Sequence, residues 1–243
     1  MTIYGKPKVR FVGGDAIHVD FCDEISLDCN RRVHAVYYAI LNDLREGRVL
    51  DIVEAVPAYS SLTIFYDPRK VRHDSLTSYV SKVFEYVITQ PLNELVKPRV
   101  FKIPVAYGGE FGPDFNDVLK ITKLTAEEFI RIHTSKEYTC YMLGFTPGFL
   151  YLGDVDDRIA VPRLETPRTK IPAGSVGIAG KQTGLYGVES PGGWRLVGRT
   201  PIKTFDYRRT PPIPIKPGDL IRFYAIDCDE YLKLKDKFVD EVQ

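Results

Sequence analysis

The chain has 243 residues, 44% of them hydrophobic, which is enough to bury the core of one large domain or two small ones. Its 33 basic and 32 acidic residues leave a net charge of +1, so no global field favours nucleic acid or an anionic membrane. No apolar run approaches the roughly 20 residues that span a bilayer, and the N-terminal residues lack the apolar region of a signal peptide. We expect a soluble, cytoplasmic protein without a nucleic-acid or membrane partner.

The first hundred residues alternate between strand and helix patterns. Strands are predicted at 8–12, 17–21, 52–56 and 62–66, and helices at 28–46 and 74–89, where apolar residues recur every three or four positions. Asp28 is expected to cap the first helix, and Gly47 to stop it. These elements predict an α+β domain over residues 1–93, and a linker bounded by prolines at 90–98.

The rest of the chain changes character after two short helices. A strand is expected at 101–107 and helices at 115–121 and 125–133, the second with a capping box formed by Thr125 and Glu128. From Gly144 to Gly218 the chain holds 12 of its 19 glycines and 10 of its 17 prolines, interleaved with aromatic residues. Short strands joined by tight turns need this mixture, so residues 94–243 are predicted to form a mainly β barrel, ending in a charged helix at 229–242.

Cysteine and histidine usage predicts no metal site. The four cysteines are scattered and form no CxxC pair, so buried free thiols are expected rather than a disulfide or a zinc site. The four histidines all precede the glycine-rich segment, which therefore has no His ligand set of its own.

A basic cluster lies within the glycine-rich segment, where Arg163, Arg168 and Lys170 share one short stretch interrupted by proline. Arg168 and Lys170 are two residues apart, so in a strand they point to the same side, and Arg199 follows beyond the turns. Cations beside glycines that expose the backbone are suited to a carboxylate or phosphate. The alternative is a solvated surface with an ion pair to Glu165 or Glu189.

Polar side chains near this cluster offer further ligand contacts. Gln182, Tyr186 and Glu189 could hold a small amide-containing ligand, although turn chemistry explains such residues equally. Phe145, Phe149, Tyr151 and Trp194 are candidates for a pocket or a partner surface, against a default of core packing.

Three further residues are candidates for acid–base work. Glu110 lies on a glycine-rich loop and is the preferred catalytic carboxylate. Asp114 could pair with it, but a role as helix cap is favoured. His133 is the second catalytic candidate, although a structural role at the end of its helix explains it as well. Ser175 is not part of a GxSxG motif, because Ala173 stands at the position of the first glycine, and no histidine follows it in the chain. Both facts argue against a Ser-His-Asp hydrolase.

Long ordered motifs carry a resemblance to a known family. They comprise YGGEFGPD at 107–114, YMLGFTPGF at 141–149, TPRTK at 166–170, PAGSVGIAG at 172–180 and ESPGGW at 189–194. The chain resembles the family that includes allophanate hydrolase subunit 1, the Kip I-type kinase inhibitor and the B-type subunit of 5-oxoprolinase. The resemblance implies a ferredoxin-like split arrangement in the N-terminal domain and a cyclophilin-like barrel after it.

The same resemblance implies a function that this chain performs with partners. It would be one component of an ATP-dependent 5-oxoprolinase, working with the A-type 5-oxoprolinase subunit and with the C-type one, which resembles allophanate hydrolase subunit 2. No Walker-type phosphate loop and no biotin-attachment segment is visible, so a partner would complete the ATP site. The alternatives are a module that inhibits a sensor histidine kinase and a carboxyltransferase or allophanate hydrolase-type subunit.

Overall fold

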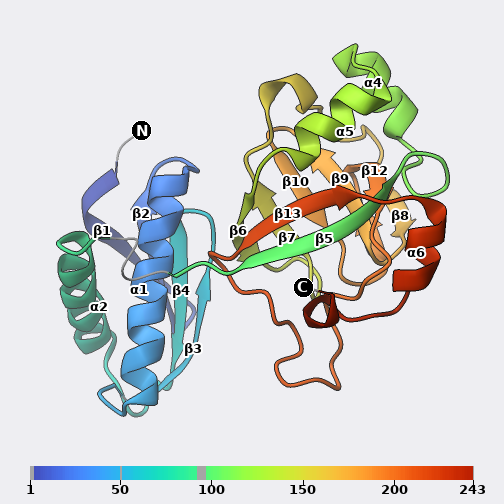
Figure 1. Cartoon of the computed structure of the whole chain (residues 1–243). Helices are drawn as coiled ribbons and strands as arrows, with labels where there is room; N and C mark the ends of the chain where they lie inside the picture. Colours follow the sequence, from blue (N-terminus) through green and yellow to red (C-terminus); the bar gives the residue numbers. More distant parts are fainter. Residues whose placement is uncertain (1–2, 50, 92–96, 243) are drawn as a thin grey trace. The chain divides into compact units, whose positions relative to one another are not determined.

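The computed structural model of the chain describes residues 3–49, 51–91 and 97–242 and divides it into two compact units, Met1–Lys97 and Pro98–Gln243 (Figure 1). Each unit has its own buried apolar cluster and is described by itself. The middle of the predicted linker, residues 92–96, lies outside the described residues. No described helix is both long enough and apolar enough to cross a membrane.

The first unit contains a four-stranded antiparallel sheet in the order β1-β2-β4-β3. The strands are β1 (Ile3–Val12), β2 (Ala16–Cys22), β3 (Ile52–Pro57) and β4 (Ser61–Tyr66). Helix α1 (Leu27–Arg45) joins β2 to β3, and β4 lies between these two strands. This is the split α+β arrangement expected for the N-terminal half.

Helices α1 and α2 (His73–Ile88) share one buried cluster with the sheet. Alternation along β2 explains this, since Ile17, Val19 and Phe21 are all fully buried in that cluster. The cap of α1 differs from the prediction: Ser26, not Asp28, precedes the helix, and its hydroxyl accepts the N–H of Cys29 at 3.2 Å. A cap must stand just outside the first turn to reach that donor, and Asp28 already lies within it.

The expectation of four free thiols is wrong. Cys22, at the end of β2, and Cys29, in the first turn of α1, form a disulfide with their Cα atoms 6.2 Å apart. The short connection from strand to helix folds the chain back on itself, so two cysteines without a CxxC spacing meet. Of the other two, Cys140 is buried and Cys228 is exposed, and both are free.

The second unit is a closed barrel of mixed strand direction, in the order β10-β7-β6-β13-β5-β12-β9. Its strands are β5 (Val100–Tyr107), β6 (Tyr138–Leu143), β7 (Leu150–Gly153), β9 (Ser175–Ala179), β10 (Gln182–Leu185), β12 (Arg195–Arg199) and β13 (Leu220–Ala225). Only the pairing of β13 with β5 is parallel among these strands. The predicted β-barrel is confirmed.

Short elements surround the barrel (Figure 1). They are α4 (Phe115–Thr122), α5 (Ala126–Thr134), α6 (Cys228–Leu234), the antiparallel pair β8 (Arg168–Ile171) and β11 (Ser190–Gly192), and the 3₁₀ turns at Asp157–Ile159 and Val239–Glu241. Both hydrogen bonds of the predicted capping box are present between Thr125 and Glu128. The single C-terminal helix predicted at 229–242 is instead α6 and a separate 3₁₀ turn.

Candidate functional site

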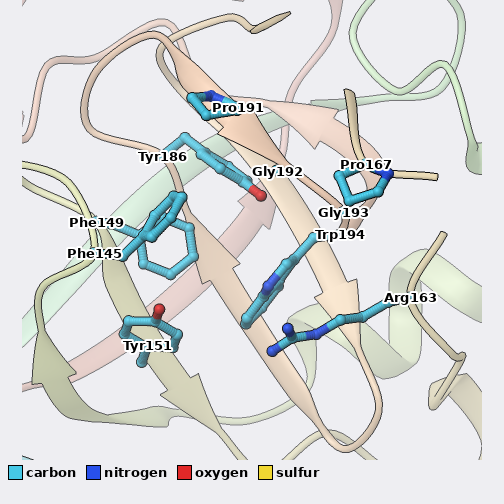
Figure 2. A pocket seen from close by; sticks show the side chains of 10 residues that line it. All are labelled: Phe145, Phe149, Tyr151, Arg163, Pro167, Tyr186, Pro191, Gly192, Gly193 and Trp194. Carbon is cyan, nitrogen blue, oxygen red and sulfur yellow. The ribbon is translucent and has the colours of Figure 1, made fainter. Parts of the chain in front are cut away.

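A pocket of about 300 Å³ opens on the second unit (Figure 2). Aromatic rings, prolines, glycines and one arginine surround it: Phe145, Phe149, Tyr151, Arg163, Pro167, Tyr186, Pro191, Gly192, Gly193 and Trp194. A volume of this size accommodates a small molecule. All four aromatic residues predicted as a pocket or partner surface lie here, and so does Tyr186, predicted as a ligand contact.

Strand alternation places the aromatic rings of this pocket outside the barrel core. On β7, Leu150 and Leu152 belong to the barrel cluster, whereas Tyr151 packs against a second cluster that contains Trp194 and Phe149, the residue just before the strand. The pocket therefore rests on a small apolar layer outside the main core.

Two glycines make room for Trp194. Gly177 on β9 and Gly184 on β10 are directly opposite each other in the antiparallel register. A Cβ atom at Gly184 would lie 2.8 Å from Cζ3 of Trp194, and one at Gly177 would lie 3.0 Å from its Cβ. The side chain of Trp194 occupies the space that side chains would fill at these positions.

The rings pack edge to face rather than as parallel plates. The ring of Phe149 lies 4.7 Å from that of Tyr186 and 5.4 Å from that of Trp194, measured between centroids, with interplanar angles of 83° and 80°. Tyr151 lies 5.9 Å from Trp194. Such arrangements satisfy the quadrupoles of the rings and hold their orientations, which gives the pocket a defined shape.

Phe145 contributes the most exposed ring of the pocket. It is 59% exposed and contacts Phe149 edge to face, with centroids 5.7 Å apart. Its φ of 65° is a left-handed conformation that costs a bulky residue on the order of 1–3 kcal/mol. An exposed aromatic ring in a strained backbone does little for folding, which is typical of a residue kept for binding.

Arg163 is the one charged side chain in the pocket lining. Its guanidinium lies over the Trp194 ring, 5.9 Å from the centroid, and Figure 2 shows it directed toward the aromatic side chains. Within the described part of the chain, no carboxylate pairs with Arg163. Its positive charge is therefore available to a ligand.

The tyrosines of the pocket stay protonated at neutral pH. Burial raises the pKa of Tyr186 to about 12, against a smaller lowering by a hydrogen bond from the backbone N–H of Trp194 and by the charge of Arg163. Burial also raises the pKa of Tyr151, and Arg163 opposes this shift too. Both phenols thus bring O–H groups, not phenolates, close to the arginine.

The predicted anion site at Arg168 and Lys170 is occupied by carboxylates of the chain itself. Arg168 donates from both terminal nitrogens to Asp114, at 2.9 and 2.6 Å, and Lys170 pairs with Glu189 at 3.2 Å. Arg168 cannot receive an anion without releasing the buried Asp114, whereas the pair of Lys170 with Glu189 is largely exposed. Lys170 makes the alternative ion pair, the one with Glu189. Arg168 pairs with Asp114 instead of Glu165 or Glu189.

Asp114 differs from its predicted role. It precedes α4, but its side chain makes no capping bond to that helix. The residue is 4% exposed, and its carboxylate also accepts the backbone N–H of Leu196 at 2.7 Å. Pro167 and Trp194 line the pocket, and Arg168 and Leu196 are close to them in the chain. By binding both Arg168 and Leu196, Asp114 links two segments of the pocket wall.

Neither of the two catalytic candidates, Glu110 and His133, lines the pocket. Glu110 is exposed on the turn after β5, where its charge raises the pKa of Tyr231 as a smaller effect than burial. His133 is fully buried, with Nδ1 2.7 Å from the Tyr107 hydroxyl and Nε2 3.0 Å from Thr183 Oγ1. Burial lowers the pKa of His133 to about 3, so the ring is neutral. This environment favours the structural alternative for His133.

The remaining predicted ligand residues are dispersed. Gln182 is half-buried on β10, and its backbone pairs with Gly153 and Ala179. Arg199 on β12 donates from Nε to the Ala173 carbonyl at 2.9 Å. Neither residue lines the pocket, and the structure does not bring them together with Tyr186.

Sequence reasoning missed Arg163 as a site residue, together with the prolines that frame it. A local feature pointed to Arg163, because it lies in the same segment, interrupted by proline, as Arg168 and Lys170. Strand alternation predicts a shared face only for Arg168 and Lys170, so only these two were assigned to the anion site. Among the described residues, no group of His, Cys, Asp or Glu side chains could hold a metal ion.

The fold and the site define a two-unit protein in which a β-barrel supports an aromatic small-molecule pocket with a single arginine. The chain belongs to the family described as carboxyltransferase domain, subdomain C and D, whose model matches residues 7–215. It is 42% identical to the B-type subunit of 5-oxoprolinase from Bacillus subtilis over 238 residues, covering 95% of this chain and 97% of the relative.

Two further similarities extend this comparison. The chain is 33% identical to the B-type 5-oxoprolinase subunit of Escherichia coli O157:H7, covering 90% of this chain and 95% of the relative. The crystal structure of TTHA0988 matches with a TM-score of 0.74 and 32% identity, over 88% of this chain. The present chain spans 40% of the length of TTHA0988.

Proposed function

We propose that the chain is the B-type subunit of an ATP-dependent 5-oxoprolinase, which opens 5-oxoproline to glutamate. The observation that carries this proposal is the 42% identity to the Bacillus subtilis protein across nearly the full length of both chains. Such end-to-end similarity supports a shared role of the whole chain rather than a shared domain alone.

The chain is proposed to act only with partners. A B-type component implies others, and we propose the A-type 5-oxoprolinase subunit and the C-type one, which is similar to allophanate hydrolase subunit 2. The absence of a Walker-type motif from the sequence supports an ATP site completed by a partner. His133 is fully buried in the core, so it is not exposed to exchange a proton with a ligand. This is consistent with an incomplete set of catalytic residues in this chain.

Reconstitution tests the proposal. The chain would be co-purified with the A-type and C-type partners, and 5-oxoproline-dependent ATP hydrolysis and glutamate formation would be measured. We expect turnover with all three proteins and none with the chain alone. Equal turnover by the two partners without the chain, or robust turnover by the chain alone, would contradict the proposed role.

A carboxyltransferase role is the second candidate. The family description, carboxyltransferase domain, favours it. The same reconstituted mixture, supplied with carboxylated biotin and urea in place of 5-oxoproline, distinguishes the two. Decarboxylation of carboxylated biotin that requires the chain would favour the carboxyltransferase role. If the mixture turns over 5-oxoproline but does not decarboxylate biotin, the carboxyltransferase role is excluded.

A further inference from the structure

We propose that this chain itself holds the substrate, in the pocket around Trp194: a five-membered cyclic amide with its ring among the aromatic side chains and its carboxylate on Arg163. The inference rests on the proposed function for the identity of the ligand, 5-oxoproline, and deepens it by assigning substrate binding to this component of the complex. It moves the anion site away from Arg168 and Lys170.

The charge of the pocket selects the ligand's anionic group. Arg163 is the single charged residue in the lining, and in the described chain it has no carboxylate partner. By contrast, Arg168 and Lys170 each pair with a carboxylate of the chain, Asp114 and Glu189. A guanidinium held over an indole presents a planar fork that matches one carboxylate, and one positive charge balances one negative charge.

The walls of the pocket select a small, compact ring. Phe149, Tyr186 and Trp194 are each at most 5% exposed, so the rings are fixed by the chain before a ligand arrives. A cavity of about 300 Å³ with such walls has room for one small ring and little more. Phe145, whose ring is more than half exposed, is placed to cover a ligand once it has entered.

A hydroxyl group can recognise the amide of the ring. Tyr186 lines the pocket, and its hydroxyl has a proton to donate. Because burial keeps this phenol protonated, it donates to a carbonyl oxygen rather than repelling it. A ligand with a carboxylate at one end and a neutral carbonyl at the other therefore matches both polar groups.

Trp194 provides a direct test, because it is the only tryptophan of the chain and it lines the pocket. Its fluorescence would be followed while 5-oxo-L-proline is added to the full chain and to the reconstituted complex. The comparison ligands are 2-pyrrolidone, which has the ring without the carboxylate, and acetate, which has the carboxylate without the ring. Only 5-oxo-L-proline is expected to give a saturable change at millimolar concentration or below.

Arg163→Gln is the decisive variant, and Arg222→Gln, at an exposed position of β13 outside the pocket, is the matched control. Loss of one charge-assisted contact should raise the Kd for 5-oxo-L-proline about ten- to a hundredfold in Arg163→Gln, with no change in Arg222→Gln. Arg163 is exposed, so the variant is expected to fold, and its thermal unfolding is measured alongside. Arg163→Lys, which keeps the charge, should recover part of the affinity.

The outcomes separate this inference from the proposed function. A complex that turns over 5-oxoproline, while neither the full chain nor the complex shows a Trp194 response that depends on Arg163, would overturn the pocket assignment and leave the function standing. Binding that depends on Arg163, in a complex without oxoprolinase turnover, would support the pocket and overturn the proposed function. Equal binding by 2-pyrrolidone would overturn the role of Arg163.

Discussion

At the scale of single residues, one carboxylate does more than any other to join the segments around the pocket. Asp114 accepts two hydrogen bonds from the guanidinium of Arg168 and one from the backbone N–H of Leu196. The aspartate is buried, whereas about a third of the Arg168 side chain remains exposed. Removing the aspartate would leave a partly buried cation and a buried N–H group without their acceptor.

We predict that Asp114→Ala lowers the free energy of unfolding by about 2–4 kcal/mol, toward the lower end of the range for broken buried ion pairs because Arg168 keeps some solvent. Denaturant unfolding followed by Trp194 fluorescence measures this. Asp117→Ala is the control, since its ion pair with Lys120 is exposed on both sides and its removal should lower the free energy of unfolding much less than Asp114→Ala does. Equal losses in the two variants would remove the special role of Asp114.

The buried imidazole of His133 makes a prediction about pH. Its pKa is near 3 in the folded chain, because of burial, against about 6.5 when unfolded. Between these values the unfolded chain binds the additional proton, so stability is full above pH 6.5 and decreases as the pH falls toward 3. One such group changes the unfolding free energy by at most about 1.4 kcal/mol per pH unit.

His133→Gln keeps hydrogen-bonding groups near Tyr107 and Thr183 but does not titrate. We expect it to be less stable than the parent chain at pH 7.5, and the difference to shrink as the pH is lowered to 4.5. Unfolding curves at four pH values in this range give the comparison. A difference that stays constant with pH would mean that the imidazole is not kept neutral by the fold.

At the scale of elements, the paired glycines of β9 and β10 decide where the pocket lies. A residue with a side chain at Gly184 would meet Cζ3 of Trp194 at 2.8 Å and the Leu150 carbonyl oxygen at 2.9 Å. Since backbone on one side and an aromatic ring on the other both resist displacement, the strand pair cannot accept even a methyl group without a shift of Trp194.

We therefore predict that Gly184→Ala costs about 1–3 kcal/mol of stability and shifts the emission of Trp194. Gly193→Ala is the matched control from the same pocket, because a Cβ atom there would meet its nearest neighbour, Cγ of Pro167, at an ordinary 3.6 Å. Unfolding and fluorescence spectra of both variants test this. If Gly184→Ala retained the parent's spectrum and stability, the glycines would not be the reason for the indole's position.

At the scale of the whole molecule, the two units have separate cores. The barrel cluster and the pocket cluster draw all their buried residues from Pro98–Gln243, and the cluster of the first unit draws all of its own from Met1–Lys97. A domain of this size with its own core is able to fold alone.

We predict that residues 98–243, expressed alone, fold and unfold in one cooperative transition and keep the Trp194 emission of the full chain. Circular dichroism and fluorescence during thermal unfolding check this. A fragment without a cooperative transition would show that the barrel needs the first unit, and the division into two domains would have to be abandoned.

The amino-acid sequence alone was sufficient for features set by neighbours along the chain. Three- and four-residue spacing located the helices, alternation located the strands, and the capping box of Thr125 and Glu128 was found from its local motif. The density of glycine and proline predicted the barrel. The ordered motifs indicated the family, which the match over residues 7–215 confirms.

Only the tertiary structure decided which distant groups meet. Strand alternation alone placed Arg168 beside Lys170 and therefore in a free anion site. The fold brings Arg168 into contact with Asp114, 54 residues away in the chain, which no local pattern indicates. The return of the chain from β2 into α1 likewise pairs Cys22 with Cys29. Arg163 and Trp194 share a pocket because the segments that carry them are hydrogen-bonded, with the Leu164 N–H donating to the Gly193 carbonyl at 2.8 Å, and spacing along the chain does not predict that pairing.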